Sequence, residues 1–199
     1  MTENNSLKLV FDEPKQRVKP PKHFADLDPE GRKQLAIELG IPAFRAKQVA
    51  THFFTHFNDE TESWSDIPKE MRSLLAEKFT PKLISLVRTI ECDGGTTRKD
   101  LWRLHDGTLV ESVLMRYSDR TTVCISSQAG CGMDCPFCAT GQLGLTRNLS
   151  AAEITAQVVA AAKASADGEL PGGPTRLSNV VFMGMGEPMA NYKAVIQSI

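Results

Sequence analysis

Cys131-Gly132-Met133-Asp134-Cys135-Pro136-Phe137-Cys138 places three thiols within eight residues. A fourth cysteine, Cys124, lies seven residues upstream, and the fifth, Cys92, is farther away. Cysteines that only pack in a core have no reason to cluster in this way. Thiolates spaced Cys-x3-Cys-x2-Cys can each take one corner of a metal site. The stretch therefore predicts a metal centre, and the segments on either side of it have different patterns.

The identity of the metal stays open from the residues alone. Soft thiolates select zinc, copper(I) or an iron–sulfur cluster. A structural zinc needs four ligands, whereas the stretch supplies three and no histidine follows it, so Cys124 or Cys92 would have to complete the site. A [4Fe–4S] cluster on three cysteines would instead leave one iron open to a small chelating ligand.

Bulk composition excludes several classes of protein. The 199 residues are 41% hydrophobic and 24% charged, as in ordinary globular proteins. The net charge of −1 does not indicate nucleic acid, so an RNA partner would need a local basic patch. No apolar run is long enough for a membrane span, and no secretory pattern opens the sequence. An odd number of clustered cysteines without an export signal favours the cytoplasm over a secreted disulfide framework.

The patterning predicts four parts. Residues 1–21 are basic and proline-rich, which is typical of a flexible tail. Residues 22–81 predict a small helical domain, in which Asp28 before a proline is a helix N-cap. Residues 82–118 predict a small antiparallel sheet with glycine-containing turns. Residues 119–199 predict the first strand–helix units of a parallel α/β sheet or barrel.

One carboxylate stands out in the third strand of the predicted antiparallel sheet. Strand side chains alternate, so Glu111 shares a face with Leu109, Val113 and Met115. A carboxylate among apolar neighbours tends to have a raised pKa and to be either paired or functional. The alternative, a glutamate on an edge strand paired with a nearby lysine or arginine, is slightly favoured by the residues alone.

The last part combines two motifs at the ends of strands. Residues 121–127 predict a strand with Cys124 on its polar face, and Ser150 and Glu153 form a capping box for a helix ending near Ala166. Residues 179–183 predict a parallel strand buried on both faces. Ligands gather at the C-terminal ends of such strands. Both the cysteine stretch and Gly184-Met185-Gly186-Glu187-Pro188 fall there.

These motifs resemble a known family. The three-cysteine spacing, with Phe137 before the last cysteine, is similar to the signature of radical S-adenosylmethionine (SAM) enzymes, and the Gly184–Pro188 segment is similar to their motif for the SAM amino group. More narrowly, the chain from about residue 28 onward resembles the RlmN family, which methylates adenine in large-subunit ribosomal RNA and in transfer RNA. The segments that carry this narrower resemblance are 44–48, 106–111, 126–131, 137–141, 147–149 and 183–188.

The resemblance implies roles for individual residues. Cys131, Cys135 and Cys138 would hold a [4Fe–4S] cluster, and SAM would bind its open iron with help from Gly186 and Glu187. In this family a first SAM methylates a cysteine near the C-terminus, and a radical from a second SAM activates that methyl group. Glu111 matches the proton acceptor. Cys124 matches the cysteine that forms a disulfide with the methyl-carrying one.

The resemblance also implies substrates and partners. The reaction would add a methyl group to carbon 2 of an adenine in 23S rRNA and in tRNA. The resemblance also implies an electron donor such as flavodoxin. It implies a monomeric protein with a partial (β/α) barrel.

No cysteine follows Cys138, so the methyl-carrying cysteine has no counterpart. We therefore expect an N-terminal portion that is inactive alone. The alternatives are the related carbon-8 methyltransferase and a non-catalytic zinc-binding RNA module. Cys92 matches no catalytic position and is expected to be a buried strand residue.

Overall fold

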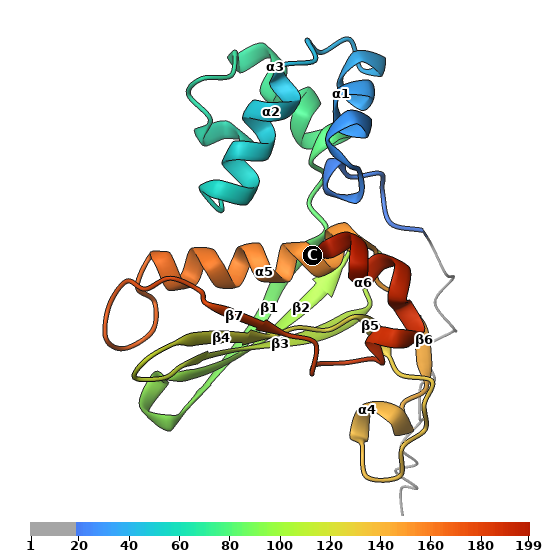
Figure 1. The fold of residues 1–199 in the computed structure, drawn as a ribbon, viewed down its shortest axis with the longest axis vertical. Coiled ribbons are helices and arrows are strands. Elements are labelled where there is room, and N and C mark those ends of the chain that lie inside the picture. The colour runs from blue at the N-terminus through green and yellow to red at the C-terminus, as the bar shows by residue number, and fades with distance from the viewer. Residues whose placement is uncertain (1–18) are drawn as a thin grey trace, which may run out of the picture.

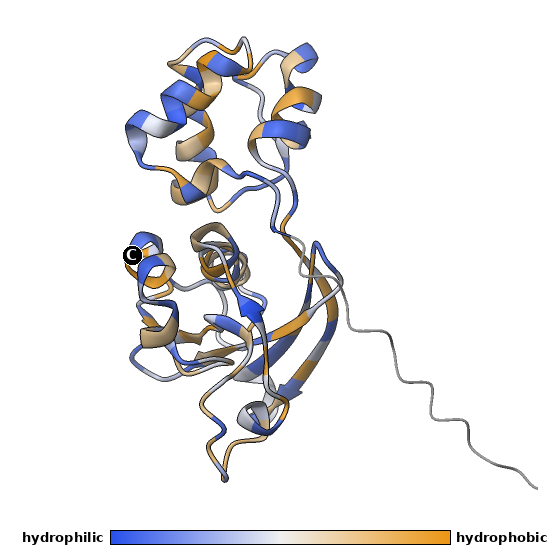
Figure 2. Ribbon diagram, turned by 90° about the vertical axis from the view of Figure 1, so that its right-hand side faces the viewer, coloured by the Kyte–Doolittle hydropathy of each residue, from blue (hydrophilic) through white to orange (hydrophobic). Residues whose placement is uncertain are grey.

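The computed structural model describes residues 19–199 and consists of a helical bundle and a sheet layer, with helix α5 between them (Figure 1). The same arrangement is visible from the side, where the bundle stands apart from the sheet and its covering helices (Figure 2). Most of the predicted tail, residues 1–18, lies outside the described part of the chain. No helix within residues 19–199 is both long and apolar enough to cross a membrane.

The bundle confirms the predicted helical segment. Its elements are η1 (Phe24–Asp26), α1 (Pro29–Glu38), α2 (Arg45–Ala50) continued by the π-helix η2 (Thr51–Thr55), η3 (Thr61–Ser63), and α3 (Lys69–Leu74) continued by the π-helix η4 (Leu75–Phe79). Asp28 caps α1 as predicted, since its Oδ1 accepts the Gly31 N–H at 2.7 Å. The core is aromatic: the Phe24 and Phe79 rings stack at 5.3 Å, and Phe53 is buried.

One five-stranded sheet runs through the rest of the molecule, in the order β1-β2-β3-β4-β7. Its strands are β1 (Ile84–Cys92), β2 (Thr97–Leu104), β3 (Leu109–Arg116), β4 (Thr121–Cys124) and β7 (Asn179–Val181), with the turn η5 (Asp93–Gly95) between β1 and β2. The first four strands are antiparallel, and β7 pairs with β4 in parallel. The antiparallel strands expected in 82–118 therefore share a sheet with the strand–helix part.

Helix α5 (Ala151–Ala166) lies in the connection between β4 and β7, after β5 and β6, and covers one face of the sheet. The predicted capping box is present: Ser150 Oγ accepts the Glu153 N–H, and the Glu153 carboxylate accepts the Ser150 N–H. Val110, Leu114 and Val123 are buried on the covered face. The chain ends with η6 (Pro188–Asn191) and α6 (Tyr192–Ser198), and α6 lies against α5.

Three expectations about strands are wrong. The strand expected at 121–127 ends at Cys124, because the chain then separates into β5 (Gln128–Gly130), which pairs with β6 (Leu145–Asn148) in a second sheet. The segment 179–183 is partly exposed rather than buried, with Val180 41% and Met183 79% exposed; within residues 19–199, β7 pairs only with β4. Cys92 is exposed because it ends the other edge strand, β1.

Candidate cofactor site and the adjoining sheet face

A short ribbon carries the cysteine loop, by which we mean residues 131–144. The ribbon is the β5–β6 pair, in which Ala129 lies opposite Arg147. The two ends of the loop meet closely, since the Cys131 N–H donates to the Gly144 carbonyl at 3.0 Å. Gly130 has a φ of 77°, and a Cβ there would lie 2.0 Å from the Gly144 oxygen. Glycine is therefore required at the base of the loop.

Within the loop, the thiols fit a soft metal group by their chemistry. Cys131 is buried, Cys135 and Cys138 are half-buried, and the Cys138 N–H donates to the Cys135 carbonyl at 3.0 Å. A Cβ on Gly141, in the short helix α4 (Ala139–Gln142), would lie 3.0 Å from the Cys135 nitrogen, so the backbone wraps tightly. Among residues 19–199, no three Cys, His, Asp or Glu side chains are gathered closely enough to hold a metal ion. The fit to a thiolate-held cluster rests on the chemistry of the donors, since Cys131, Cys135 and Cys138 are three soft thiols within one short loop.

A fourth thiol from Cys92 is not available to close a zinc site. Cys92 is on β1, whereas the loop follows β4 and β5, so three strand spacings separate β1 from β4. At ordinary strand spacing this is about 14 Å. The zinc alternative consequently depends on Cys124, the last residue of β4.

The Gly184–Pro188 segment lies directly against the chain that leads into the loop. The Gly184 N–H donates to the Ile125 carbonyl at 3.0 Å, and the Met185 carbonyl accepts the Ser127 N–H at 2.9 Å. The Glu187 N–H donates to Gln128 Oε1 at 2.9 Å. Residues 125–128 and the glycine-rich segment thus run side by side, so the chain that leads into the cysteine loop lies against this segment.

Glycine is required twice in this segment. A Cβ on Gly184 would lie 2.6 Å from the Ile125 oxygen. Gly186 has a φ of 99°, and a Cβ there would lie 2.5 Å from the Gln128 Cβ. Contacts this short exclude any side chain without movement of the backbone. The glycines consequently permit close backbone approach at this strand end.

Gln157 was not singled out in the sequence, yet its side chain binds the backbone just after the end of β4. Its side chain is fully buried on α5. Its Oε1 accepts the Ser126 N–H at 2.9 Å and its Nε2 donates to the Ser126 carbonyl at 3.0 Å. Ser126 Oγ in turn accepts the Met185 N–H at 2.9 Å and donates to the Glu111 carbonyl at 2.6 Å. The sequence did hold a clue: Gln157 lies three residues after Ile154 and four before Ala161, so it shares the buried face of the helix.

Glu111 and Cys124 lie on the face of the sheet opposite α5, which we call the open face. Cys124 is opposite Val113 in the β3–β4 register, so Glu111, two residues from Val113, is its diagonal neighbour. Glu111 is half-exposed, and its Oε1 lies 3.0 Å from Lys99 Nζ on β2. The expected pairing with a lysine is therefore present, but the expected edge strand is wrong, because β3 lies between β2 and β4 in the sheet. Burial raises the pKa of the Cys124 thiol, partly opposed by a hydrogen bond with the Met183 backbone.

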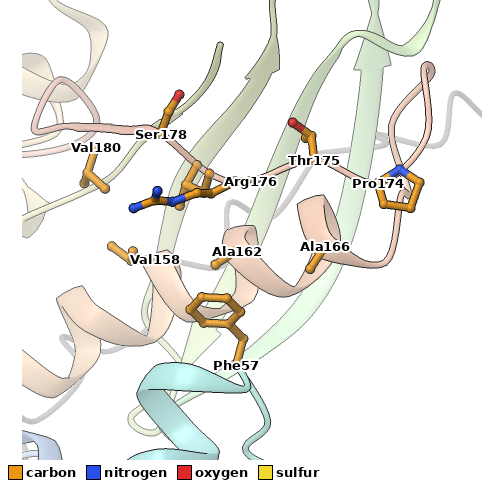
Figure 3. A pocket seen from close by; sticks show the side chains of 10 residues that line it. Phe57, Val158, Ala162, Ala166, Pro174, Thr175, Arg176, Ser178 and Val180 are labelled. Carbon is orange, nitrogen blue, oxygen red and sulfur yellow. The ribbon is translucent and has the colours of Figure 1, made fainter.

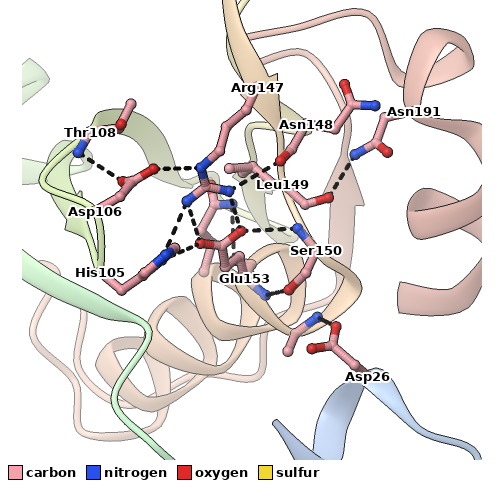
Figure 4. Close-up of polar contacts among 12 residues, drawn as sticks. Asp26, His105, Asp106, Thr108, Arg147, Asn148, Leu149, Ser150, Glu153 and Asn191 are labelled. Carbon is pink, nitrogen blue, oxygen red and sulfur yellow. Dashed lines mark hydrogen bonds and ion pairs between the residues drawn. The ribbon is translucent and has the colours of Figure 1, made fainter. Parts of the chain in front are cut away.

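A buried ion cluster lies at the base of the ribbon (Figure 4). Arg147 on β6 donates from Nε to Asp106 at 2.6 Å and from its two Nη atoms to the Glu153 carboxylate at 2.8 and 2.7 Å. His105 Nδ1 lies 3.4 Å from the same carboxylate. Burial alone would raise the pKa of Asp106, but hydrogen bonds from Arg147 and Thr108 lower it to about 2. The cluster thus joins the β2–β3 turn, the ribbon and α5.

A cavity of about 570 Å³ lies elsewhere, between the bundle and α5 (Figure 3). Phe57 projects toward Val158 and Ala162 of α5, with Arg176 at the opposite side. None of the predicted site residues lines this cavity. It therefore belongs to the contact between the bundle and the sheet layer rather than to the candidate site.

Comparison with known proteins identifies the class and then the family. No family model matches the chain. A solved radical SAM methyltransferase from Sphaerobacter thermophilus superimposes with a TM-score of 0.83 at 40% identity, over 89% of this chain and 51% of that one. Together with the cysteine loop, this fold defines the class of radical SAM methyltransferases.

The curated relatives are more specific. The probable dual-specificity RNA methyltransferase RlmN of Nocardioides sp. is 61% identical over 198 residues, which are 100% of this chain and 53% of that protein. The corresponding protein of Bifidobacterium adolescentis is 62% identical over 184 residues, 92% of this chain and 48% of the relative. The chain belongs to the RlmN family. It spans about half the length of the curated relatives it matches.

Proposed function

We propose that this chain forms the cofactor-binding part of a radical SAM enzyme that methylates carbon 2 of an adenine in 23S rRNA and in tRNA through a methyl-cysteine intermediate. The observation that carries the proposal is the packing of the Gly184–Pro188 segment along residues 125–128, immediately before Cys131. This packing places a backbone suited to a small ligand beside a loop of three soft thiols. Membership of the RlmN family supports the choice of reaction.

In this proposal Cys131, Cys135 and Cys138 hold a [4Fe–4S] cluster, which when bound supplies the electron that cleaves SAM. Gly186 and Glu187 bind SAM. Because Gly186 has no Cβ, its backbone can pack directly against Gln128 and bring the segment up to the strand end. The Glu187 carboxylate accepts the Met189 N–H at 2.9 Å, which orients it at the strand end. A partial (β/α) barrel built on β4, α5 and β7 frames the site.

Glu111 and Cys124 perform the catalytic roles on the open face. Glu111 accepts a proton from the adenine, and its carboxylate lies 3.0 Å from Lys99 Nζ. Cys124 acts as a thiol that closes onto the methyl-carrying cysteine. The two residues are diagonal neighbours on one face, so a single substrate base can contact both.

An RNA partner needs local positive charge, and the open face supplies it. Arg88 lies opposite Leu101 in the β1–β2 register, and Arg103 is two residues along β2 on the same face. Both are exposed, and neither makes an ion pair within residues 19–199. We assign these cations to RNA phosphates. A flavodoxin-like electron donor, a monomeric state and a cytoplasmic location complete the proposal; the five free thiols suit a reducing compartment.

The test is methyl transfer by the full product of the gene, reconstituted anaerobically and supplied with SAM, reductant and a 23S rRNA fragment. Substrate deuterated at carbon 2 or at carbon 8 separates the two related reactions by mass spectrometry. Loss of the carbon-2 label with gain of one methyl group is expected. Loss of the carbon-8 label, or no methylation of any RNA, would overturn the proposal.

A further inference from the structure

The ribbon that carries the cysteine loop is too short to be stable without contacts to the rest of the molecule. β5 has three residues and β6 has four, and isolated two-stranded hairpins are marginal in water even when longer. The loop between them spans 131–144 and contains the three thiols. Something outside the ribbon must therefore fix the position of the loop.

Arg147 provides the strongest such contact. It lies in β6 opposite Ala129, next to the start of the loop. Its guanidinium bonds a carboxylate from the β2–β3 turn, Asp106, and the carboxylate of Glu153 in the first turn of α5. Its side chain is 9% exposed, that of Asp106 5%, and that of Glu153 0%. Charge-assisted, bidentate bonds in such a buried place are strong and geometrically specific.

The same helix continues this connection to the glycine-rich segment. One turn after Glu153, Gln157 donates to the Glu153 carbonyl at 3.3 Å and holds Ser126 through two further hydrogen bonds. Ser126 Oγ then accepts the Met185 N–H. A continuous set of contacts thus runs from Arg147 through α5 to the Gly184–Pro188 segment.

We propose that Arg147 is a positioning residue, which fixes the cysteine loop relative to the Gly184–Pro188 segment by tying the ribbon to the β2–β3 turn and to α5. It acts through the position of the loop, since its recorded contacts are with other residues of the chain. The proposal rests on the proposed function, because the loop must present its thiols beside the segment that binds SAM. Loss of the Arg147 contacts loosens the loop more than the rest of the molecule.

The chain offers a matched control in Arg98. This arginine on β2 also serves two carboxylates: Asp100 at 2.8 and 3.0 Å, and Glu169 just after α5. Its side chain is 13% exposed. It makes no contact with the cysteine loop. Substitution of either arginine breaks an ion cluster with two carboxylates, of which Glu169 is the more exposed one, but the structure connects only Arg147 to the loop.

The experiment compares Arg147→Lys and Arg147→Met with Arg98→Lys and Arg98→Met in the cluster-free chain. Amide hydrogen exchange is followed by mass spectrometry on peptides covering residues 131–144 and on peptides from α5, below the unfolding transition. Arg147→Met should speed exchange in the loop about tenfold with α5 protection retained, since local openings have their own free energies. Arg147→Lys keeps the charge but loses the bidentate fork and should be intermediate.

Neither Arg98 variant should change exchange in the loop, whatever it does to the unfolding midpoint. Equal loop exchange in the Arg147 and Arg98 variants, or unchanged loop exchange in both Arg147 variants, would overturn the proposal. If Arg147→Met does not fold, loop exchange is measured in Arg147→Lys and in Asp106→Asn, which removes the charge of one Arg147 partner. Unchanged loop exchange in both would overturn the proposal. A wild-type chain that takes up no iron contradicts the proposed function, whereas the exchange comparison still decides whether Arg147 fixes the loop.

Discussion

The carboxylate of Glu111 lies diagonally across β3 and β4 from the thiol of Cys124, and Lys99 holds that carboxylate at 3.0 Å. Glu111 and Cys124 are far apart in the sequence, and the pairing register of β3 and β4 brings them to the same face of the sheet. Both side chains are half-buried, so both are partly accessible from the open face.

Cys124 should react slowly with alkylating agents. Burial raises the pKa of its thiol, so little thiolate is present at neutral pH. Cys92 is exposed and should be alkylated several-fold faster by iodoacetamide in the folded chain. Peptide mass spectrometry over a time course measures both rates. Equal rates in the native chain would contradict the burial of Cys124, whereas equal rates after denaturation are expected and provide the control.

Gly186→Ala should destabilise the glycine-rich segment strongly. The new Cβ would lie 2.5 Å from the Gln128 Cβ at a φ of 99°. Backbone strain of this kind costs about 1–3 kcal/mol, and the clash adds to it. Gly173→Ala is the control, because its φ is also positive, at 78°, but nothing lies within 4 Å of the added carbon. Urea denaturation should show a clearly larger loss for Gly186→Ala; similar losses would count against the close approach.

Gln157→Met should destabilise the chain more than its small change in volume suggests. The substitution leaves the N–H and the carbonyl of Ser126 without the partners they have on α5. Each buried, unsatisfied polar group costs about 1–3 kcal/mol. Gln34→Met, on the exposed side of α1, should change the free energy of unfolding by less than about 0.5 kcal/mol. Comparable effects at the two positions would mean that the Ser126 contacts contribute little.

The helical bundle should lose stability in mild acid because of His23. Burial, with a smaller contribution from Arg32, lowers the pKa of His23 from 6.5 to about 3. Between these values the unfolded chain binds a proton that the folded chain does not. The free energy of unfolding should therefore fall, by about 1.4 kcal/mol per pH unit from this group, as the pH drops from 6.5 toward 3.

His23→Asn removes this titration while keeping a side-chain acceptor for the Ala25 N–H, which His23 Nδ1 accepts at 3.1 Å. The variant should be less stable at neutral pH and should lose stability less steeply below pH 6.5. His56→Asn, at an exposed position, should keep the wild-type pH dependence. Chemical denaturation at several pH values measures all three proteins, and identical slopes for wild type and His23→Asn would refute the assignment.

The local rules of the sequence predicted the helix starts correctly. Asp28 and Ser150 both cap helices, because capping depends on residues three positions apart and needs no tertiary partner. The proximity of the chain after β4 to the Gly184–Pro188 segment after β7 was also predictable, since parallel strands present their C-terminal ends at one edge.

The features that the sequence did not predict depend on tertiary contacts. The ribbon of β5 and β6 has too few residues for a periodic pattern, and the buried bonds of Arg147 to Asp106 and Glu153 join segments far apart in sequence. Lys99 became the partner of Glu111 through a strand register that the pattern did not specify. The apolar run at 179–183 predicted burial, but burial on both faces requires covering layers on both sides of the sheet, which a strand pattern does not specify, and Val180 is 41% exposed.

The central claim is that Cys131, Cys135 and Cys138 hold a [4Fe–4S] cluster. The most direct test is the iron, sulfide and zinc content of the anaerobically reconstituted chain, with a Cys135→Ala variant and a Cys92→Ala control. About four irons and four sulfides per chain are expected in the wild type and in Cys92→Ala, with loss in Cys135→Ala. Stoichiometric zinc without iron or sulfide would contradict the account.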